Sequence, residues 1–145
     1  MSAALMFALV FTVALVMTKA YFLMGSVPLL VLKHDTPLDA RFVRGFFNTY
    51  YVLSLITAGG TAVGYALAGR PALATGAALL ALLAFVLRKQ MIPKMDALGA
   101  QIQSSGVGAI PGFRRAHLIA IGLNLAQLVL IVWCLMGLRT WSDFR

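Results

Sequence analysis

Acidic residues are scarce in this chain of 145 residues, which has no glutamate and only four aspartates. These are Asp35, Asp39, Asp96 and Asp143, and all four stand outside the long apolar runs described below. No carboxylate is therefore available inside an apolar segment. This counts against a proton-driven carrier, because carriers of that class usually depend on such an acid.

Cysteine is nearly absent as well, and Cys134 has no partner for an intrachain disulfide or a thiolate metal site. We interpret it as a small packing residue. The two histidines, His34 and His117, have no cysteine or carboxylate at metal-ligand spacing, which argues against a metal or haem site. Glycine-rich phosphate loops and the HExxH and GxSxG motifs are missing too, so common nucleotide and hydrolase signatures give no support. We expect no cofactor.

Apolar residues, by contrast, make up 61% of the chain, and the mean hydropathy is +0.92. This leaves too little polar sequence to cover a soluble globule of this size. Four apolar runs cover Ala3 to Leu32, Phe42 to Leu67, Ala72 to Leu87 and Leu118 to Leu138. Only helices satisfy every backbone group within one segment in lipid, and the alternation of barrel strands is missing. The sequence predicts an all-α polytopic membrane protein, with residues 1–145 forming a single four-helix transmembrane domain.

Basic residues outnumber acidic ones by twelve to four, and eight of the twelve fall in two segments, Lys33 to Arg44 and Arg88 to Arg115. These eight are Lys33, Arg41, Arg44, Arg88, Lys89, Lys94, Arg114 and Arg115. Positive residues favour the cytoplasmic side, so we expect both termini on the non-cytoplasmic side of a bacterial inner membrane. The first run has no basic residue before it and no small-residue cleavage site, so we expect a retained helix and not a signal peptide.

A net charge of +8 would suggest nucleic acid as the partner of a soluble protein. Here the charges lie beside the ends of apolar runs, so we interpret them as topology signals and contacts to anionic headgroups. We expect membrane lipids and no nucleic acid as partners. The candidate anion or headgroup contacts are Arg41, Arg44, Arg88, Arg114, Arg115 and His117. Arg88 and His117 would either hold a lipid phosphate or acidic partner together, or separately anchor one helix and cap the next.

Local signals predict where the helices begin, end and meet. Thr36 and Pro37 suit a helix start, and the Gly69-Arg70-Pro71 segment predicts a tight turn between antiparallel helices. Gly60 and Gly64 form a small-xxx-small pair that permits close approach of another helix.

The connection after the third run is the least hydrophobic part of the chain. Pro93 should interrupt the helix, and Met95, Leu98 and Ile102 then recur at helical spacing. We expect a short, separate amphipathic helix on the cytoplasmic surface, ending in a flexible run from Ser104 to Gly112.

Lys19 is the one basic residue in the middle of an apolar run, roughly 25 Å of helix from Ser2 and roughly 21 Å from Lys33 at about 1.5 Å per residue. Its stem is too short to reach an interface, so it should face the bundle interior and a partner. Thr12, Lys19, Ser26 and Lys33 recur every seven residues on one face of the helix. The fourth predicted helix carries His117, Asn124 and Gln127. We therefore predict a polar seam of Thr12, Lys19, Ser26, Asn124 and Gln127, with Ser54, Thr57 or Thr61 contributing.

The counter-group of Lys19 has three possible origins. The amine can be neutral and hydrogen-bonded to hydroxyls and amides, it can meet an anionic or carbonyl-bearing ligand, or another protein chain can supply an acid or carbonyl.

Three stretches together resemble one family: Val43 to Tyr51, Leu87 to Leu98 and Phe113 to Asn124. Their order and spacing look like the small four-span family that includes transmembrane protein 205 and many bacterial proteins. Matching positions are Arg88 with Pro93, and Phe113 with His117 and Asn124. The resemblance implies the four-span fold and its topology, and it implies no particular reaction.

Two functional hypotheses follow. The first is a non-catalytic membrane protein, either an accessory subunit of a larger membrane complex or a small lipid-interacting protein. The second is a membrane enzyme or small exporter that acts on a hydrophobic substrate at the Lys19 seam.

Overall fold

The computed structural model describes residues 2–31, 37–105 and 110–142, except for the side chains of residues 37, 103, 105 and 137–142. The described residues form four α-helices and no strand: α1 (Ala3–Leu29), α2 (Pro37–Leu67), α3 (Pro71–Ser105) and α4 (Ile110–Ser142). Each helix is long and apolar enough to cross a membrane. The predicted all-α four-helix bundle is confirmed, and the chain is an integral membrane protein.

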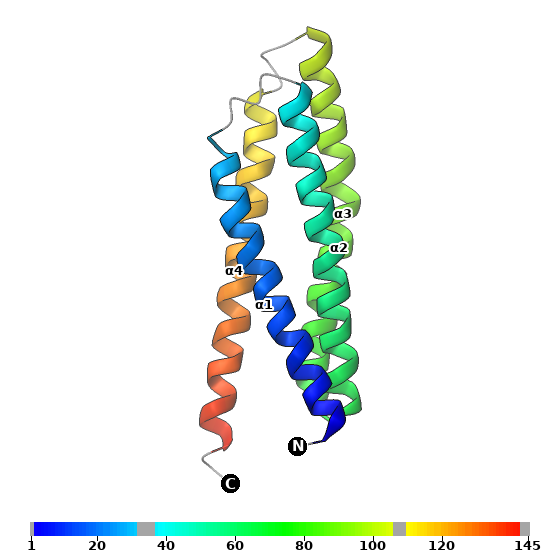
Figure 1. Ribbon diagram of the computed structural model, residues 1–145, viewed down its shortest axis with the longest axis vertical. Helices are drawn as coiled ribbons and strands as arrows, with labels where there is room; N and C mark the ends of the chain where they lie inside the picture. Colours follow the sequence, from blue (N-terminus) through cyan, green and yellow to red (C-terminus); the bar gives the residue numbers. More distant parts are fainter. Residues whose placement is uncertain (1, 32–36, 106–109, 143–145) are drawn as a thin grey trace.

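The helices run alternately up and down, which places both chain ends at the same end of the bundle (Figure 1). α2 packs most extensively against α3 and then against α1, whereas α4 meets α1 and α3 over smaller areas. Figure 1 shows α4 diverging from α1 toward the end that holds the termini. In the described part of the chain, α2 and α4 make no close backbone contact, so only side chains can connect them.

The turn between α2 and α3 forms as the sequence predicts. α2 ends at Leu67, Gly69 adopts φ +69°, and α3 begins at Pro71. Glycine pays no steric penalty in this left-handed conformation, and proline suits the first position of a helix. The two helices therefore become antiparallel neighbours. Pro37 likewise begins α2 as predicted, while the Thr36 cap lies outside the described residues.

At the small-xxx-small pair of α2, α1 approaches closely. A Cβ atom added to Gly64 would lie 2.7 Å from the Cα of Ala8, and one added to Gly60 would overlap the ring of Phe11. Only glycine allows the two backbones to come this close. The prediction of close helix packing at this pair is confirmed.

Two predicted helix boundaries, the end of α3 and the start of α4, are wrong. α3 does not break at Pro93 but continues to Ser105, so the amphipathic segment is its last part and not a separate surface helix. Met95 and Ile102 of this segment are buried in a core cluster with Val43 and Phe113, and that packing outweighs the hydrogen bond that proline removes. α4 begins at Ile110, well before the apolar run, and thus includes part of the run expected to be flexible.

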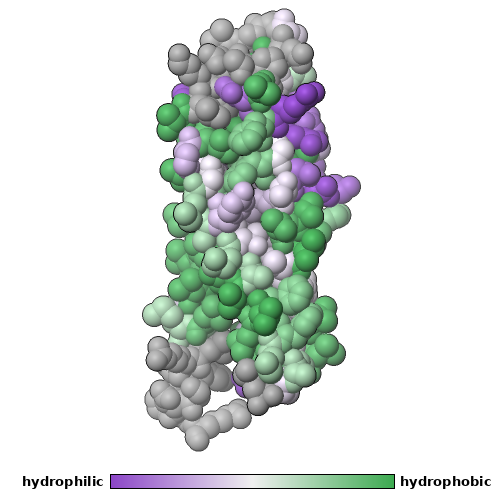
Figure 2. Space-filling model, in the orientation of Figure 1, coloured by the Kyte–Doolittle hydropathy of each residue, from purple (hydrophilic) through white to green (hydrophobic). Residues whose placement is uncertain are grey.

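The surface divides along the length of the bundle. Figure 2 shows hydrophilic side chains toward the end where α2 begins and α3 ends, and hydrophobic ones over much of the opposite half. We call the first of these the basic end. Large apolar side chains such as Met24, Phe42 and Trp133 are exposed, as expected where lipid replaces water. Cys134 is exposed too, so its interpretation as a packing residue is wrong.

Candidate functional site

Lys19 lies at the centre of a buried polar network inside the bundle. Its side chain is only 1% exposed, although it carries a long stem and an amino group. Nζ donates hydrogen bonds to the hydroxyls of Tyr50 at 2.8 Å and Ser54 at 2.7 Å, both on α2. It also donates to Oε1 of Gln127 on α4 at 2.8 Å. The amine therefore connects α1 to both of its neighbours.

Asn124 closes the network from α4. Its Nδ2 donates to the backbone carbonyl of Lys19 at 3.0 Å, and its Oδ1 accepts a hydrogen bond from the Tyr50 hydroxyl. The Tyr50 oxygen thus accepts from Lys19 and donates to Asn124. Since α2 and α4 make no close backbone contact, this chain of side chains is their connection at this level.

An ammonium group has three donors, and all three of those on Lys19 point to acceptors of its own chain. Buried polar groups are costly unless they are paired in this way. The sequence leaves three possible origins for the counter-group of Lys19. The structure shows the first of these, the hydroxyls and the amide of its own chain, as the hydrogen-bond partners. These hydrogen bonds hold α1, α2 and α4 together. No N–H of the Lys19 amine points into an open cavity.

The predicted seam is only partly brought together. Lys19, Asn124 and Gln127 meet, but Thr12 donates to the carbonyl of Ala8 at 2.7 Å, and Ser26 has no hydrogen-bond partner for Oγ among the described residues. The reason is axial distance, because residues seven apart share a face but lie about 10 Å apart along a helix. On α2, only Ser54 of the three suggested hydroxyls reaches Lys19. Thr57 and Thr61 donate to backbone carbonyls one turn earlier.

Tyr50 is the network member that the sequence analysis missed. From the sequence, Tyr50 counts only as part of the stretch Val43 to Tyr51 that carries the family resemblance, and no role of its own follows for it. One signal was available: Tyr50 lies four residues before Ser54, and Thr57 and Thr61 follow at helical spacing on the same face.

Aromatic side chains close the network toward the basic end. The Phe22 ring stacks on Tyr50 with centroids 4.0 Å apart and meets the edge of Phe47 at 5.0 Å. Phe47 in turn contacts His117 edge to face at 5.0 Å. His117 is completely buried, two turns inside α4, so its predicted roles as a headgroup contact and as a helix cap are wrong.

The predicted arginine contacts lie at or near the basic end in different settings. Arg88 is half-buried and donates from Nε to Oδ1 of Asn48 at 3.0 Å, which joins α3 to α2. Arg114 and Arg115 are exposed on the first turns of α4. Arg44 forms an ion pair with Asp96, and Arg41 is exposed beside it.

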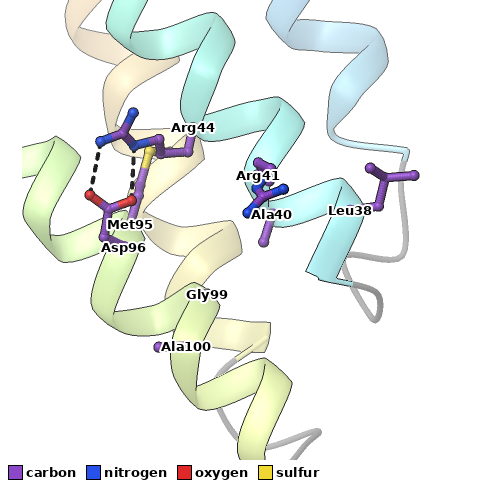
Figure 3. Close-up of a pocket in the computed structure, with 8 residues that line it drawn as sticks. All are labelled: Leu38, Ala40, Arg41, Arg44, Met95, Asp96, Gly99 and Ala100. Carbon is purple, nitrogen blue, oxygen red and sulfur yellow. Dashed lines mark hydrogen bonds and ion pairs between the residues drawn. The ribbon is translucent and has the colours of Figure 1, made fainter.

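Arg41 and Arg44 line a cavity of about 470 Å³ between the start of α2 and the end of α3, which we call the arginine pocket (Figure 3). Its lining residues are Leu38, Ala40, Arg41, Arg44, Met95, Asp96, Gly99 and Ala100.

A second cavity, of about 290 Å³, lies in the half of the bundle away from the basic end. We call it the apolar groove. All four helices contribute to it through Thr12, Leu15, Thr61, Tyr65, Ala72, Leu73, Gly76, Ala77, Leu79, Leu80, Leu83, Leu130, Ile131, Cys134 and Leu135. Its few hydroxyls are already engaged, because Thr12 and Thr61 donate to backbone carbonyls and Tyr65 lies 3.4 Å from the Thr12 oxygen. Neither this groove nor the arginine pocket is lined by Lys19.

Within the described ranges, no three histidine, cysteine or acidic side chains come together in a way that would hold a metal ion. Comparisons with family models, with curated proteins and with solved structures find no match to this chain. The resemblance to the four-span family of transmembrane protein 205 therefore stays a prediction.

Proposed function

We propose that this integral membrane protein is a non-catalytic, lipid-interacting protein that holds an acyl chain in the apolar groove. The observation that carries the proposal is the separation of its polar and apolar features. The Lys19 amine donates its hydrogen bonds to Tyr50, Ser54 and Gln127, and it lines neither cavity. We therefore interpret it as a structural connection between helices.

The groove fits a saturated or unsaturated hydrocarbon chain better than a polar substrate. Eleven of its fifteen lining residues are alanine, leucine, isoleucine or glycine, and its threonine hydroxyls are already bonded to the backbone. Burying a polar ligand group there would leave that group without partners, which is costly in an apolar medium. Exposed side chains at its rim, including Leu79 and Leu130, face the hydrocarbon around the helices. The acyl chains of the bilayer are the molecules that surround this opening.

Gly76 offers a direct test. It lines the groove, and a Cβ added there meets nothing within 4 Å, so Gly76→Leu fills the groove without displacing the backbone. Gly122→Leu on α4 is the matched control, because Gly122 has equally open surroundings but lies outside the groove.

The measurement is native mass spectrometry of the protein purified in mild detergent. We expect the wild-type protein and Gly122→Leu to retain lipid and Gly76→Leu to lose it. Equal lipid retention by both variants contradicts the groove as the site. A stoichiometric second protein in place of lipid would instead favour an accessory subunit of a larger complex.

A further inference from the structure

The arginine pocket carries features of a second binding site, at the other end of the bundle from the apolar groove. Its existence follows from small residues on both helices. A Cβ added to Gly99 would lie 3.5 Å from the Cβ of Ala40, so α2 and α3 touch there. Ala100, which is exposed beside this contact, leaves the adjoining space open. The cavity of about 470 Å³ is the result.

One guanidinium group in the pocket is held in a fixed orientation. Arg44 donates from Nε to Oδ1 of Asp96 at 2.8 Å and from Nη2 to Oδ2 at 3.1 Å, as the paired dashed lines in Figure 3 show. The two side chains are 38% and 53% exposed, so the pair contributes little to stability. It does use only two of the five guanidinium N–H donors, which leaves three for another acceptor.

The second guanidinium group in the pocket, that of Arg41, has no hydrogen-bond partner among the described residues. Arg41 precedes Arg44 by three residues and thus shares its face of α2. It is exposed and makes no hydrogen bond or ion pair with any residue that the structure describes. Among the residues that line the pocket, the two arginines and Asp96 leave one positive charge in excess. The first turn of α2 also holds Asp39, whose carboxylate offsets the positive end of the helix dipole there, so the arginines supply the positive charge of the pocket.

We propose that the arginine pocket binds a phosphate group, with Arg41 and the free edge of Arg44 as its ligands. A carboxylate presents two oxygens in one plane, and a single guanidinium fork satisfies both, as Arg44 does for Asp96. A phosphate presents oxygens in several directions and can accept forks from two arginines at once. The phosphate belongs to either a lipid headgroup or a soluble phosphate ester, and the experiment below separates these sources.

The full-length protein is titrated calorimetrically with inorganic phosphate in an uncharged detergent, with acetate as the comparison anion. In parallel, it is placed in phosphatidylcholine nanodiscs with and without phosphatidic acid, and native mass spectrometry counts the bound phosphatidic acid. Arg41→Gln should weaken phosphate-type binding about tenfold, since it removes a charge-assisted contact. Asp96→Asn should strengthen binding, because it removes a competing carboxylate.

Arg115→Gln is the matched control, since Arg115 is an exposed arginine at the same end but outside the pocket. Its affinity should equal that of the wild-type protein. If the unfolding temperature of Arg41→Gln is unchanged, its weaker phosphate affinity reflects a lost contact and not a loss of folded protein. Binding of inorganic phosphate assigns the pocket to a soluble ester, and binding of phosphatidic acid alone assigns it to a headgroup. The proposal is overturned if neither inorganic phosphate nor phosphatidic acid binds, or if acetate displaces the bound phosphate. It is also overturned if Arg115→Gln loses as much affinity as Arg41→Gln.

Discussion

The Lys19 Nζ atom lies 2.8 Å from Oε1 of Gln127, a residue 108 positions further along the chain. This contact joins the first helix to the last, and the bonds of the same amine to Tyr50 and Ser54 bring in the second. A lysine in an apolar segment usually marks a functional site. Here its partners make it a connection to α4, which packs against α1 over a small area and, among the described residues, makes no close backbone contact with α2.

Tyr50→Phe should lower the unfolding free energy by about 1 kcal/mol, because it removes the hydroxyl between Lys19 and Asn124 but keeps the ring that stacks on Phe22. Tyr51→Phe is the control: Tyr51 is also buried, but its hydroxyl makes no hydrogen bond within the described part of the chain. Denaturant titration in mixed micelles measures both variants. Equal losses would show that the Tyr50 hydroxyl has no special role.

Asn124→Leu should destabilise the bundle more than Gln101→Leu does. Asn124 is buried and bonded to both α1 and α2, whereas Gln101 is exposed on α3. The cost should be about 1 to 3 kcal/mol, since the substitution leaves the Tyr50 hydroxyl without its acceptor. Thermal unfolding in detergent gives the comparison. A stable Asn124→Leu protein would contradict a structural role for the network.

Gly64→Ala should cost about 1 to 3 kcal/mol, because the new Cβ would lie 2.7 Å from the Ala8 backbone and force α1 away. Gly59→Ala is matched in residue type and helix, but its Cβ meets nothing within 4 Å. That control should be neutral or stabilised by up to about 1 kcal/mol through helix propensity. The same unfolding assay applies. If both substitutions behave alike, α1 does not pack closely at Gly64.

Arg88→Gln should weaken the contact between α3 and α2, because it removes the 3.0 Å hydrogen bond from Nε to Asn48. The expected loss is about 1 kcal/mol. Lys89→Gln removes an exposed charge from the adjacent position and should change stability little. A loss in Lys89→Gln as large as in Arg88→Gln would show a general effect of charge at this end and not the specific bond.

The number and class of the helices follow from the sequence, because apolar runs of this length have one stable form in lipid. The residues at which the helices begin and end near the basic end of the bundle do not follow from the sequence. Hydropathy delimits the part of a helix that suits hydrocarbon, and α4 is helical from Ile110 although its apolar run begins at Leu118. Pro93 likewise suggested a break, but burial of Met95 and Ile102 keeps α3 continuous.

The candidate site was predictable in its polar core and not in its details. Burial of a lysine required partners, and the amides on the fourth run were the available ones, so Lys19, Asn124 and Gln127 could be grouped in advance. Which residues share an axial level depends on how the helices are offset. The sequence does not contain that offset directly, so it predicts Thr12 and Ser26 as members of the network and does not single out Tyr50.

The most direct test of the account is a double-mutant cycle between Lys19 and Gln127. Lys19→Met, Gln127→Leu and the double variant are unfolded in mixed micelles beside the wild-type protein. We predict a coupling free energy of about 0.6 to 1.7 kcal/mol, which are the average and the maximum found for interhelical hydrogen bonds in a membrane protein. A second cycle that pairs Lys19→Met with Gln101→Leu should show none. Additive losses in the first cycle, within about 0.3 kcal/mol, would contradict the claim that Lys19 joins α1 to α4.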